Sequence, residues 1–135
     1  MYSRTGQSAY AQVSLESQLA GATPHQLITM LLEGAVNAMV RAKIYFEQGN
    51  IARRGEMISR AINIIDNGLR SALNHDVGGK ISEELESLYE YVSRSLLLVN
   101  FNQTPEALPH LIEIMSNISI TWKEIEPANK QVSHG

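Results

Sequence analysis

The sequence contains no cysteine, and this absence excludes several classes of site at once. A chain without thiols forms no disulfides, offers no cysteine nucleophile and holds no cysteine-ligated metal. Packing alone must stabilise the fold, and a reducing compartment, the cytosol, is expected. Long apolar runs are also absent. No stretch approaches the ~20 apolar residues that span a bilayer, and no basic stretch followed by an apolar one begins the chain. We therefore expect a soluble, unprocessed protein without membrane insertion.

An excess of positive charge is missing as well. The chain has 11 Lys and Arg residues against 14 Asp and Glu, a formal net charge of −3. Binding to nucleic acid depends on clustered cations that neutralise phosphates, so nucleic acid is not an expected partner. The histidines include no pair at i,i+4 spacing, and the Glu-x-x-His repeats of di-iron bundles do not occur. We predict no catalytic site, no metal, no cofactor and no enzyme.

Caps and turn residues divide the chain into helices. Thr23, Pro24 and Gln26 form the pattern of a capping box with proline at the first helical position, and Gly49 ends the helix that they begin. No alternating run is long enough for a sheet. The predicted fold is all-α, an antiparallel up-and-down four-helix bundle with a short N-terminal cap segment. Its parts are an arm or cap at 1–22, a bundle at 23–126 with helices at about 24–48, 51–73, 80–99 and 105–125, and a disordered tail at 127–135.

Pro109 conflicts with the last of these helices. A proline four residues inside a helix that begins at Pro105 lacks the donor for the first full backbone hydrogen bond. The sequence therefore allows two alternatives, a kink at Pro109 or a helix that begins later than Pro105.

The first helix carries more apolar surface than a bundle core needs. At about 100° per residue, an arc facing the interior holds Leu27, Ile28, Leu31, Ala35, Ala38, Met39, Ala42 and Phe46. A separate row at steps of four holds Leu32, Val36, Val40 and Ile44. The second helix adds Met57 and Ile64, next to Ala61 and Gly68, whose small size would leave a shallow groove. The third helix adds Tyr91 and Leu98.

Two interpretations of this surplus remain open. Scattered apolar residues are ordinary on any protein surface, but rows on consecutive turns form a contiguous patch, and such patches tend to mark binding sites. The predicted ligand is an amphipathic helix or an extended peptide. The alternative is a structural helical module that associates with itself through a two-fold patch. We expect a monomer, with weak homodimer formation as the second possibility.

Seven segments of the chain, taken in order, carry a resemblance to a known family. They are YAQVSLES (10–17), ATPHQLITMLLEGA (22–35), EQGN (47–50), AINIIDNGLRSALN (61–74), GGKI (78–81), LYEYV (88–92) and WKEI (122–125). Together they resemble the FliS family of flagellin-specific export chaperones. The resemblance covers nearly the whole chain, including both loops and the N-terminal tyrosine.

The resemblance implies a client and a compartment. A member of this family binds the disordered C-terminal segment of flagellin in the cytoplasm, prevents its premature polymerisation and keeps it competent for flagellar type III secretion. Export-gate components or flagellar regulators are implied as further partners. The N-terminal segment can lie over part of the client groove, which makes Tyr10 and Val13 candidates for a self-occupying lid. The predicted partner-binding residues are Tyr10, Val13, Leu32, Val36, Val40, Ile44, Met57, Ile64, Tyr91 and Leu98.

Overall fold

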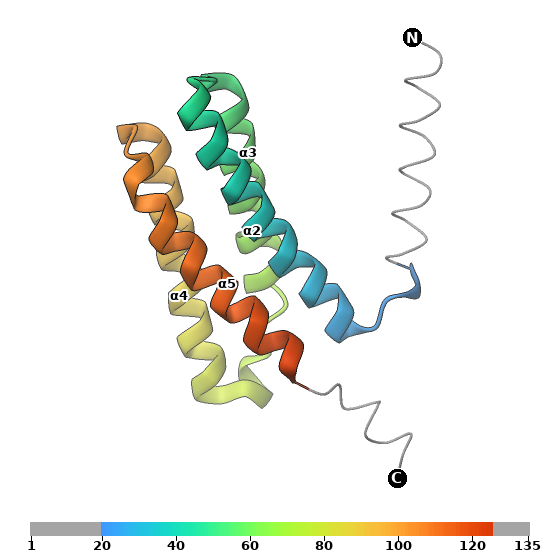
Figure 1. The fold of residues 1–135 in the computed structure, drawn as a ribbon. Helices are drawn as coiled ribbons and strands as arrows, with labels where there is room; N and C mark the ends of the chain where they lie inside the picture. Colours follow the sequence, from blue (N-terminus) through green and yellow to red (C-terminus); the bar gives the residue numbers. More distant parts are fainter. Residues whose placement is uncertain (1–19, 126–135) are drawn as a thin grey trace.

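The structure is a computed structural model that describes residues 20–125 (Figure 1). Helices account for almost all of these residues. The helices are α2 (Pro24–Gln48), α3 (Ile51–Asn63), α4 (His75–Asn102) and α5 (Leu108–Glu124), with a π-helical segment η1 (Ile64–Arg70) and a 3₁₀ turn η2 (Pro105–Ala107). Successive helices run in opposite directions, and each helix packs against its neighbours. No strand occurs between residues 20 and 125, so the predicted all-α fold of four packed helices is confirmed.

Two of the expected segments lie wholly or mostly outside the described residues. These are the arm at 1–22, with Tyr10 and Val13, and the tail at 127–135. Among the helices that the structure does describe, none has the length and apolar content needed to cross a bilayer.

The start and end of α2 follow from its cap residues. The Thr23 hydroxyl accepts a hydrogen bond from the Gln26 N–H at 3.1 Å, and the Gln26 side chain accepts one from the Thr23 N–H at 2.8 Å. This is the predicted capping box, with Pro24 at the first helical position. Gly49 ends the helix in the left-handed conformation, at φ 70°, which glycine adopts without steric cost.

The second helix differs from its prediction over its C-terminal half. We expected a regular α-helix to residue 73, but the chain widens into the π-helical segment η1 after Asn63. Two contacts with neighbouring helices accompany the wider turn. Gly68 lies against Leu31, close enough that a Cβ would be 3.1 Å from Leu31 Cδ2. On the other side, Asp66 accepts a hydrogen bond from the Ser93 hydroxyl at 3.0 Å.

The third helix begins in two steps. A first turn starts at His75, where the Asn74 side chain accepts hydrogen bonds from the N–H groups of Asp76 and Val77. Gly79 then interrupts the helix at φ 52° and ψ −119°. The regular helix therefore starts near the predicted Lys80, but it continues to Asn102, three residues past the predicted end.

Pro109 is accommodated by a late start of the last helix. Residues Pro105–Ala107 form the 3₁₀ turn η2, and α5 begins at Leu108, which places Pro109 in the first turn. A proline there needs no donor, because the first N–H groups of a helix have no partner within it. The second of the two alternatives is correct.

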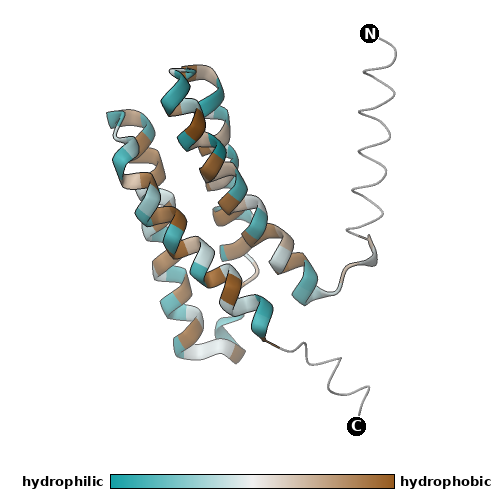
Figure 2. Cartoon of the chain, in the orientation of Figure 1, coloured by the Kyte–Doolittle hydropathy of each residue, from teal (hydrophilic) through white to brown (hydrophobic). Residues whose placement is uncertain are grey.

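The hydrophobic core runs along the bundle axis and takes side chains from every helix. Figure 2 shows apolar and polar residues recurring along each helix. At the end where α2 passes into α3, Arg54 is almost fully buried, with its guanidinium 4.4 Å from the centre of the Phe46 ring. The largest fully buried side chains are Leu32, Met39, Ile58, Ile65, Leu69, Val92, Leu96, Val99, Leu108, Leu111 and Met115.

Candidate functional site

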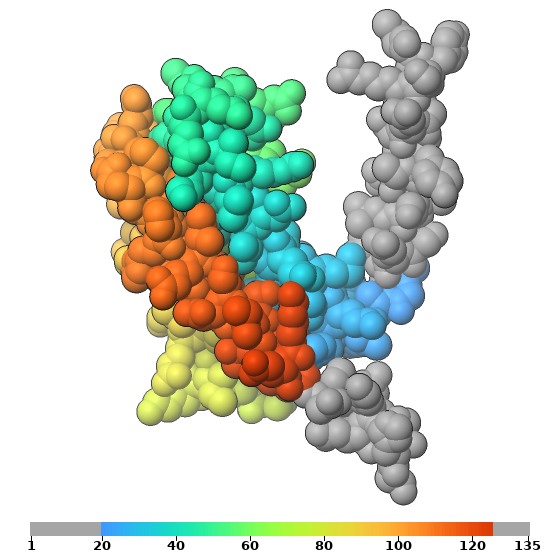
Figure 3. All heavy atoms as spheres, in the orientation of Figure 1, coloured from blue at the N-terminus to red at the C-terminus, as the bar shows by residue number. Residues whose placement is uncertain are grey.

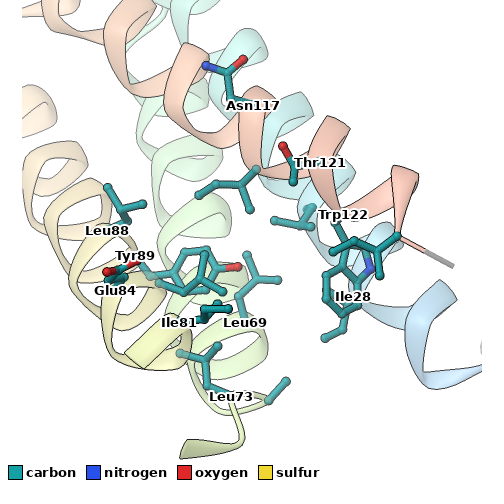
Figure 4. A pocket seen from close by; sticks show the side chains of 15 residues that line it. Ile28, Leu69, Leu73, Ile81, Glu84, Leu88, Tyr89, Asn117, Thr121 and Trp122 are labelled. Atoms are coloured by element: carbon teal, nitrogen blue, oxygen red, sulfur yellow. The ribbon is translucent and has the colours of Figure 1, made fainter. Parts of the chain in front are cut away.

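An apolar cleft opens between the first half of α4 and the last half of α5; we call it the α4–α5 cleft (Figure 4). Its volume is about 420 Å³. Residues of α2 and η1 form its floor, while α4 and α5 supply its two walls. The lining consists of Ile28, Leu32, Leu69, Ala72, Leu73, Ile81, Glu84, Leu85, Leu88, Tyr89, Asn117, Ile118, Thr121, Trp122 and Ile125.

Contacts between α5 and α2 explain why the cleft is open. The His25 and Trp122 rings stack at 4.7 Å, nearly parallel, and Trp122 Nε1–H donates to the His25 carbonyl at 3.0 Å. Lys123 of α5 also pairs with Glu33 of α2 at 2.8 Å. The C-terminal end of α5 is therefore held over the beginning of α2. The first half of α4 lies apart from this end of α5 (Figures 1 and 3). The two helices diverge, and residues 20–125 leave the space between them open.

The walls of the cleft leave large apolar side chains in contact with water. Leu88 is 39% exposed, Ile125 is 49% exposed and Ile81 is 68% exposed. The polar side chains in the lining are Glu84 on α4 and Asn117 and Thr121 on α5. A ligand that covered these walls would gain from apolar burial and would meet few groups that require hydrogen bonds.

The chemistry of the cleft fits binding better than catalysis. Tyr89 is buried in the wall, and this burial raises the pKa of its phenol to about 12, so the group stays neutral and protonated. No group of three or more His, Cys, Asp or Glu side chains that could hold a metal occurs in residues 20–125. The cleft therefore offers apolar contact, a few neutral polar groups and one carboxylate, that of Glu84.

The edge of α4 extends the cleft with two predicted residues. Tyr91 is 48% exposed and Leu98 is 50% exposed, so both lie on the surface as expected. Tyr91 makes an edge-to-face contact with His110 of α5, at 6.3 Å between ring centres. Tyr89, two residues earlier, is 3% exposed and faces the core, whereas Tyr91 faces outward.

The predicted row on α2 is partly on the surface and partly in the core. Val40 and Ile44 are exposed and Val36 is half-buried. For Leu32 the expectation of surface outside the core is wrong, because this side chain is fully buried. α5 packs against α2, and the side of α2 that carries Leu32 is the buried one. Leu27 and Leu31, which we expected to face the interior, are only half-buried.

Met57 and Ile64 line a second depression, between α2 and α3, which we call the α2–α3 groove. Its volume is about 610 Å³. Met57 is buried, so the expectation of free surface is wrong for this residue, and Ile64 is half-buried. The small residues that keep the groove open are Gly34 and Ala38 of α2. The predicted Ala61 and Gly68 do not line it, since Ala61 is fully buried and Gly68 packs on Leu31.

Sequence patterns missed most of the α4–α5 cleft. Ile81, Leu85, Leu88, Ile118 and Trp122 lie at helical spacing, which indicates an apolar face of each helix and not a cleft. Periodicity indicates which face of a helix is turned inward, but it does not indicate how far apart two neighbouring helices lie. The sequence signal that bears on the cleft is the pair His25 and Trp122. Their rings stack and hold the end of α5 against the beginning of α2.

The sequence is similar to a family of flagellar proteins and to several of its members. The family described as "Flagellar protein FliS" matches residues 6–129. The flagellar secretion chaperone FliS of Salmonella typhimurium is 47% identical over 127 residues, which is 94% of each chain. FliS of Escherichia coli is 39% identical over 92% of this chain and 91% of the relative. FliS of Vibrio cholerae is 37% identical over 88% and 87%.

Proposed function

This chain belongs to the FliS family, and we propose that it is a flagellar secretion chaperone that binds the C-terminal segment of flagellin for export. The family is not enzymatic. In this proposal the chaperone covers an aggregation-prone segment in the cytoplasm and prevents flagellin from polymerising before export. Export-gate components or flagellar regulators are proposed further partners.

The observation that carries the proposal is the open apolar α4–α5 cleft. An amphipathic helix of the client lies between α4 and α5, where a fifth helix would complete the packing. Full burial of a Leu or Ile side chain contributes about 1.5–3 kcal/mol, and the exposed parts of Ile81, Leu88 and Ile125 supply a fraction of that each. Ordering of the client helix on binding offsets part of this gain.

Two exposed rows extend this contact beyond the cleft. Tyr91 and Leu98 continue the α4 wall, so a client that fills the cleft and follows α4 meets them next. Val36, Val40 and Ile44 offer a second row on α2, for a later part of a client that wraps around the bundle. Leu32 is fully buried beneath the floor of the cleft and supports it from within the core. Tyr10 and Val13 compete with the client for the same surface.

The scarcity of charge in the cleft affects release. Glu84 is the single charged side chain among the cleft residues that the structure describes, so the client is held mainly by apolar burial. Binding of this kind depends weakly on salt and is coupled to folding of the client, which lowers the affinity per unit of buried area. A chaperone that must deliver its client benefits from both properties.

A charged residue in the cleft tests the proposal. Leu88→Asp places a carboxylate on the α4 wall, and we expect it to weaken binding of the flagellin C-terminal peptide by at least about 10-fold in calorimetry. Leu97→Asp is the matched control, because Leu97 is 60% exposed on the same helix and does not line the cleft. Circular dichroism and thermal melting check that both variants fold. Equal affinity of the two variants would contradict the proposal.

The exposed rows also support self-association as a second candidate function. Light scattering of the chain, first alone and then with the flagellin peptide, separates the two. A monomer that forms a one-to-one complex supports the chaperone, whereas a dimer that ignores the peptide supports a structural module.

A further inference from the structure

The α2–α3 groove lies on the opposite face of α2 from the α4–α5 cleft. Ile28 and Leu32 line the cleft, while Met30, Gly34 and Arg41 line the groove, and at helical spacing these two sets lie on opposite sides of α2. A short helix in one depression therefore cannot contact the other. Two separate ligands can occupy them at the same time.

The two depressions carry opposite charge. Arg41 and Arg60 line the α2–α3 groove, both are exposed, and no carboxylate lines it among the described residues. Within residues 20–125 neither guanidinium has an ion-pair partner. The cleft has the reverse arrangement, with Glu84 as its charged side chain. A helix with acidic flanks is attracted to the groove and repelled by the cleft, so the charge of the flanks selects the site.

The floor of the groove suits the close approach of a helix. Gly34 and Ala38, at i,i+4 spacing on α2, are small residues in the lining; Gly34 is half-buried and Ala38 is buried. A Cβ added at Gly34 would have Ile64 Cδ1 at 3.4 Å as its neighbour. Met30 and Met57 stand on the two walls. Methionine side chains are flexible and adapt to the ligand that packs on them.

We propose that the α2–α3 groove docks an amphipathic helix of a second protein, whose apolar face is flanked by Asp or Glu residues that pair with Arg41 and Arg60. This helix binds while the α4–α5 cleft is occupied, a part of the inference that rests on the proposed function. Arginine is suited to this contact because its planar guanidinium binds a carboxylate through two hydrogen bonds.

A pair of peptides tests the charge requirement. The first probe is a helical peptide with Leu and Ala on one face and Glu at the flanking positions, and the second has Gln in place of every Glu. We expect the Glu peptide to bind at least about 10-fold more tightly in fluorescence anisotropy, with an advantage that shrinks as salt rises. The double variant Arg41→Gln/Arg60→Gln should remove the advantage. Arg53→Gln, on the same helix but outside the groove, should keep it.

Mapping of the site separates the inference from its alternatives. Amide shifts in NMR spectra should move at Gly34 and Met57 when the Glu peptide is added, and they should stay moved after the flagellin peptide is added. Displacement by the flagellin peptide would make the groove part of the client site and overturn the inference. Self-association through Gly34 and Met57, or equal binding of both probes, would overturn it too. Leu88→Asp should leave Glu-peptide affinity unchanged, so this test and the test of the α4–α5 cleft fail independently.

Discussion

His25 and Trp122 each bind the other's backbone while their rings stack. The His25 side chain lies 2.9 Å from the Trp122 carbonyl, and the Trp122 indole donates to the His25 carbonyl at 3.0 Å. The two residues are 97 positions apart in the chain, and their contact joins the beginning of α2 to the end of α5. This contact holds one wall of the α4–α5 cleft in place.

Removing the indole donor should loosen that wall. Trp122→Phe keeps an aromatic ring against His25 but removes the indole hydrogen bond to the His25 carbonyl, which still accepts from the Thr29 hydroxyl at 3.1 Å. We therefore expect the free energy of unfolding to fall by about 0.5–1.5 kcal/mol in urea denaturation. Affinity for the flagellin peptide should fall as well, because the position of α5 is less fixed. Lys123→Ala, which removes an exposed ion pair on the same turn, should cost less than about 1 kcal/mol. Equal losses in the two variants would contradict this role for Trp122.

The ion pair between Arg70 and Glu86 should stabilise the fold in a pH-dependent way. Two hydrogen bonds from the Arg70 guanidinium, at 2.8 and 3.2 Å, hold the pKa of Glu86 below its ordinary value of 4.5. Because the pKa is lower in the folded state, the pair stabilises the fold above the unfolded-state pKa. The stabilisation is lost as the pH falls through the folded-state pKa.

Substitution of Glu86 tests this dependence. Because Arg70 and Glu86 are each about a third exposed, solvent screens the pair, and Glu86→Gln should cost about 0.5–1 kcal/mol at about pH 7. The cost should be smaller at about pH 3, where more of the carboxylate is protonated. Urea denaturation at the two pH values measures the difference. Glu90→Gln, in the more exposed pair with Arg94, is the control and should cost less. A cost for Glu86→Gln that is the same at both pH values would show that the effect is not ionic.

The exposed row on α2 predicts a second loss of client binding. Val40 and Ile44 are 38% and 43% exposed, so the double variant Val40→Asp/Ile44→Asp should fold and melt like the parent chain. Its affinity for flagellin should fall roughly 10- to 100-fold, because two apolar contacts become charged. Calorimetry with the whole C-terminal segment is the measurement. Lost folding would instead mean that the row belongs to the core.

Deletion of the N-terminal arm should change the affinity for the client in the opposite direction. If Tyr10 and Val13 compete with the client, deletion of residues 1–16 should raise the affinity for the flagellin peptide, since the client no longer has to displace them. The on-rate in stopped-flow fluorescence should rise with it. Weaker binding after deletion would show that the arm contacts the client directly.

The boundaries of the helices could be read from local signals, because caps and breakers act within one turn. Thr23, Pro24, Gln26 and Gly49 determine α2 through contacts among near neighbours, and Pro109 allowed only two outcomes. The π-helical segment could not be read in this way. Its packing contacts, Leu31 against Gly68 and Ser93 bound to Asp66, join separate helices, and local signals carry no information about them.

The candidate site was harder to predict for the same reason. Wheel positions correctly placed Val40, Ile44, Tyr91 and Leu98 on the surface, since each depends on the rotation of a single helix. Leu32 was placed wrongly because the packing of α5 decides which side of α2 is buried. The α4–α5 cleft depends on the divergence of two helices, and spacing within either helix carries no information about that divergence.

The most direct test asks whether the client lies in the α4–α5 cleft. Because the chain has no cysteine, a nitroxide can be attached at one introduced site, Thr121→Cys on the cleft wall or Arg53→Cys at the other end of the bundle. NMR spectra of an isotopically labelled flagellin C-terminal peptide are then recorded with each chain. We predict strong broadening of a helical stretch of the peptide by the label at position 121 and little broadening of that stretch by the label at position 53. Broadening of that stretch by the label at position 53 alone would contradict the account.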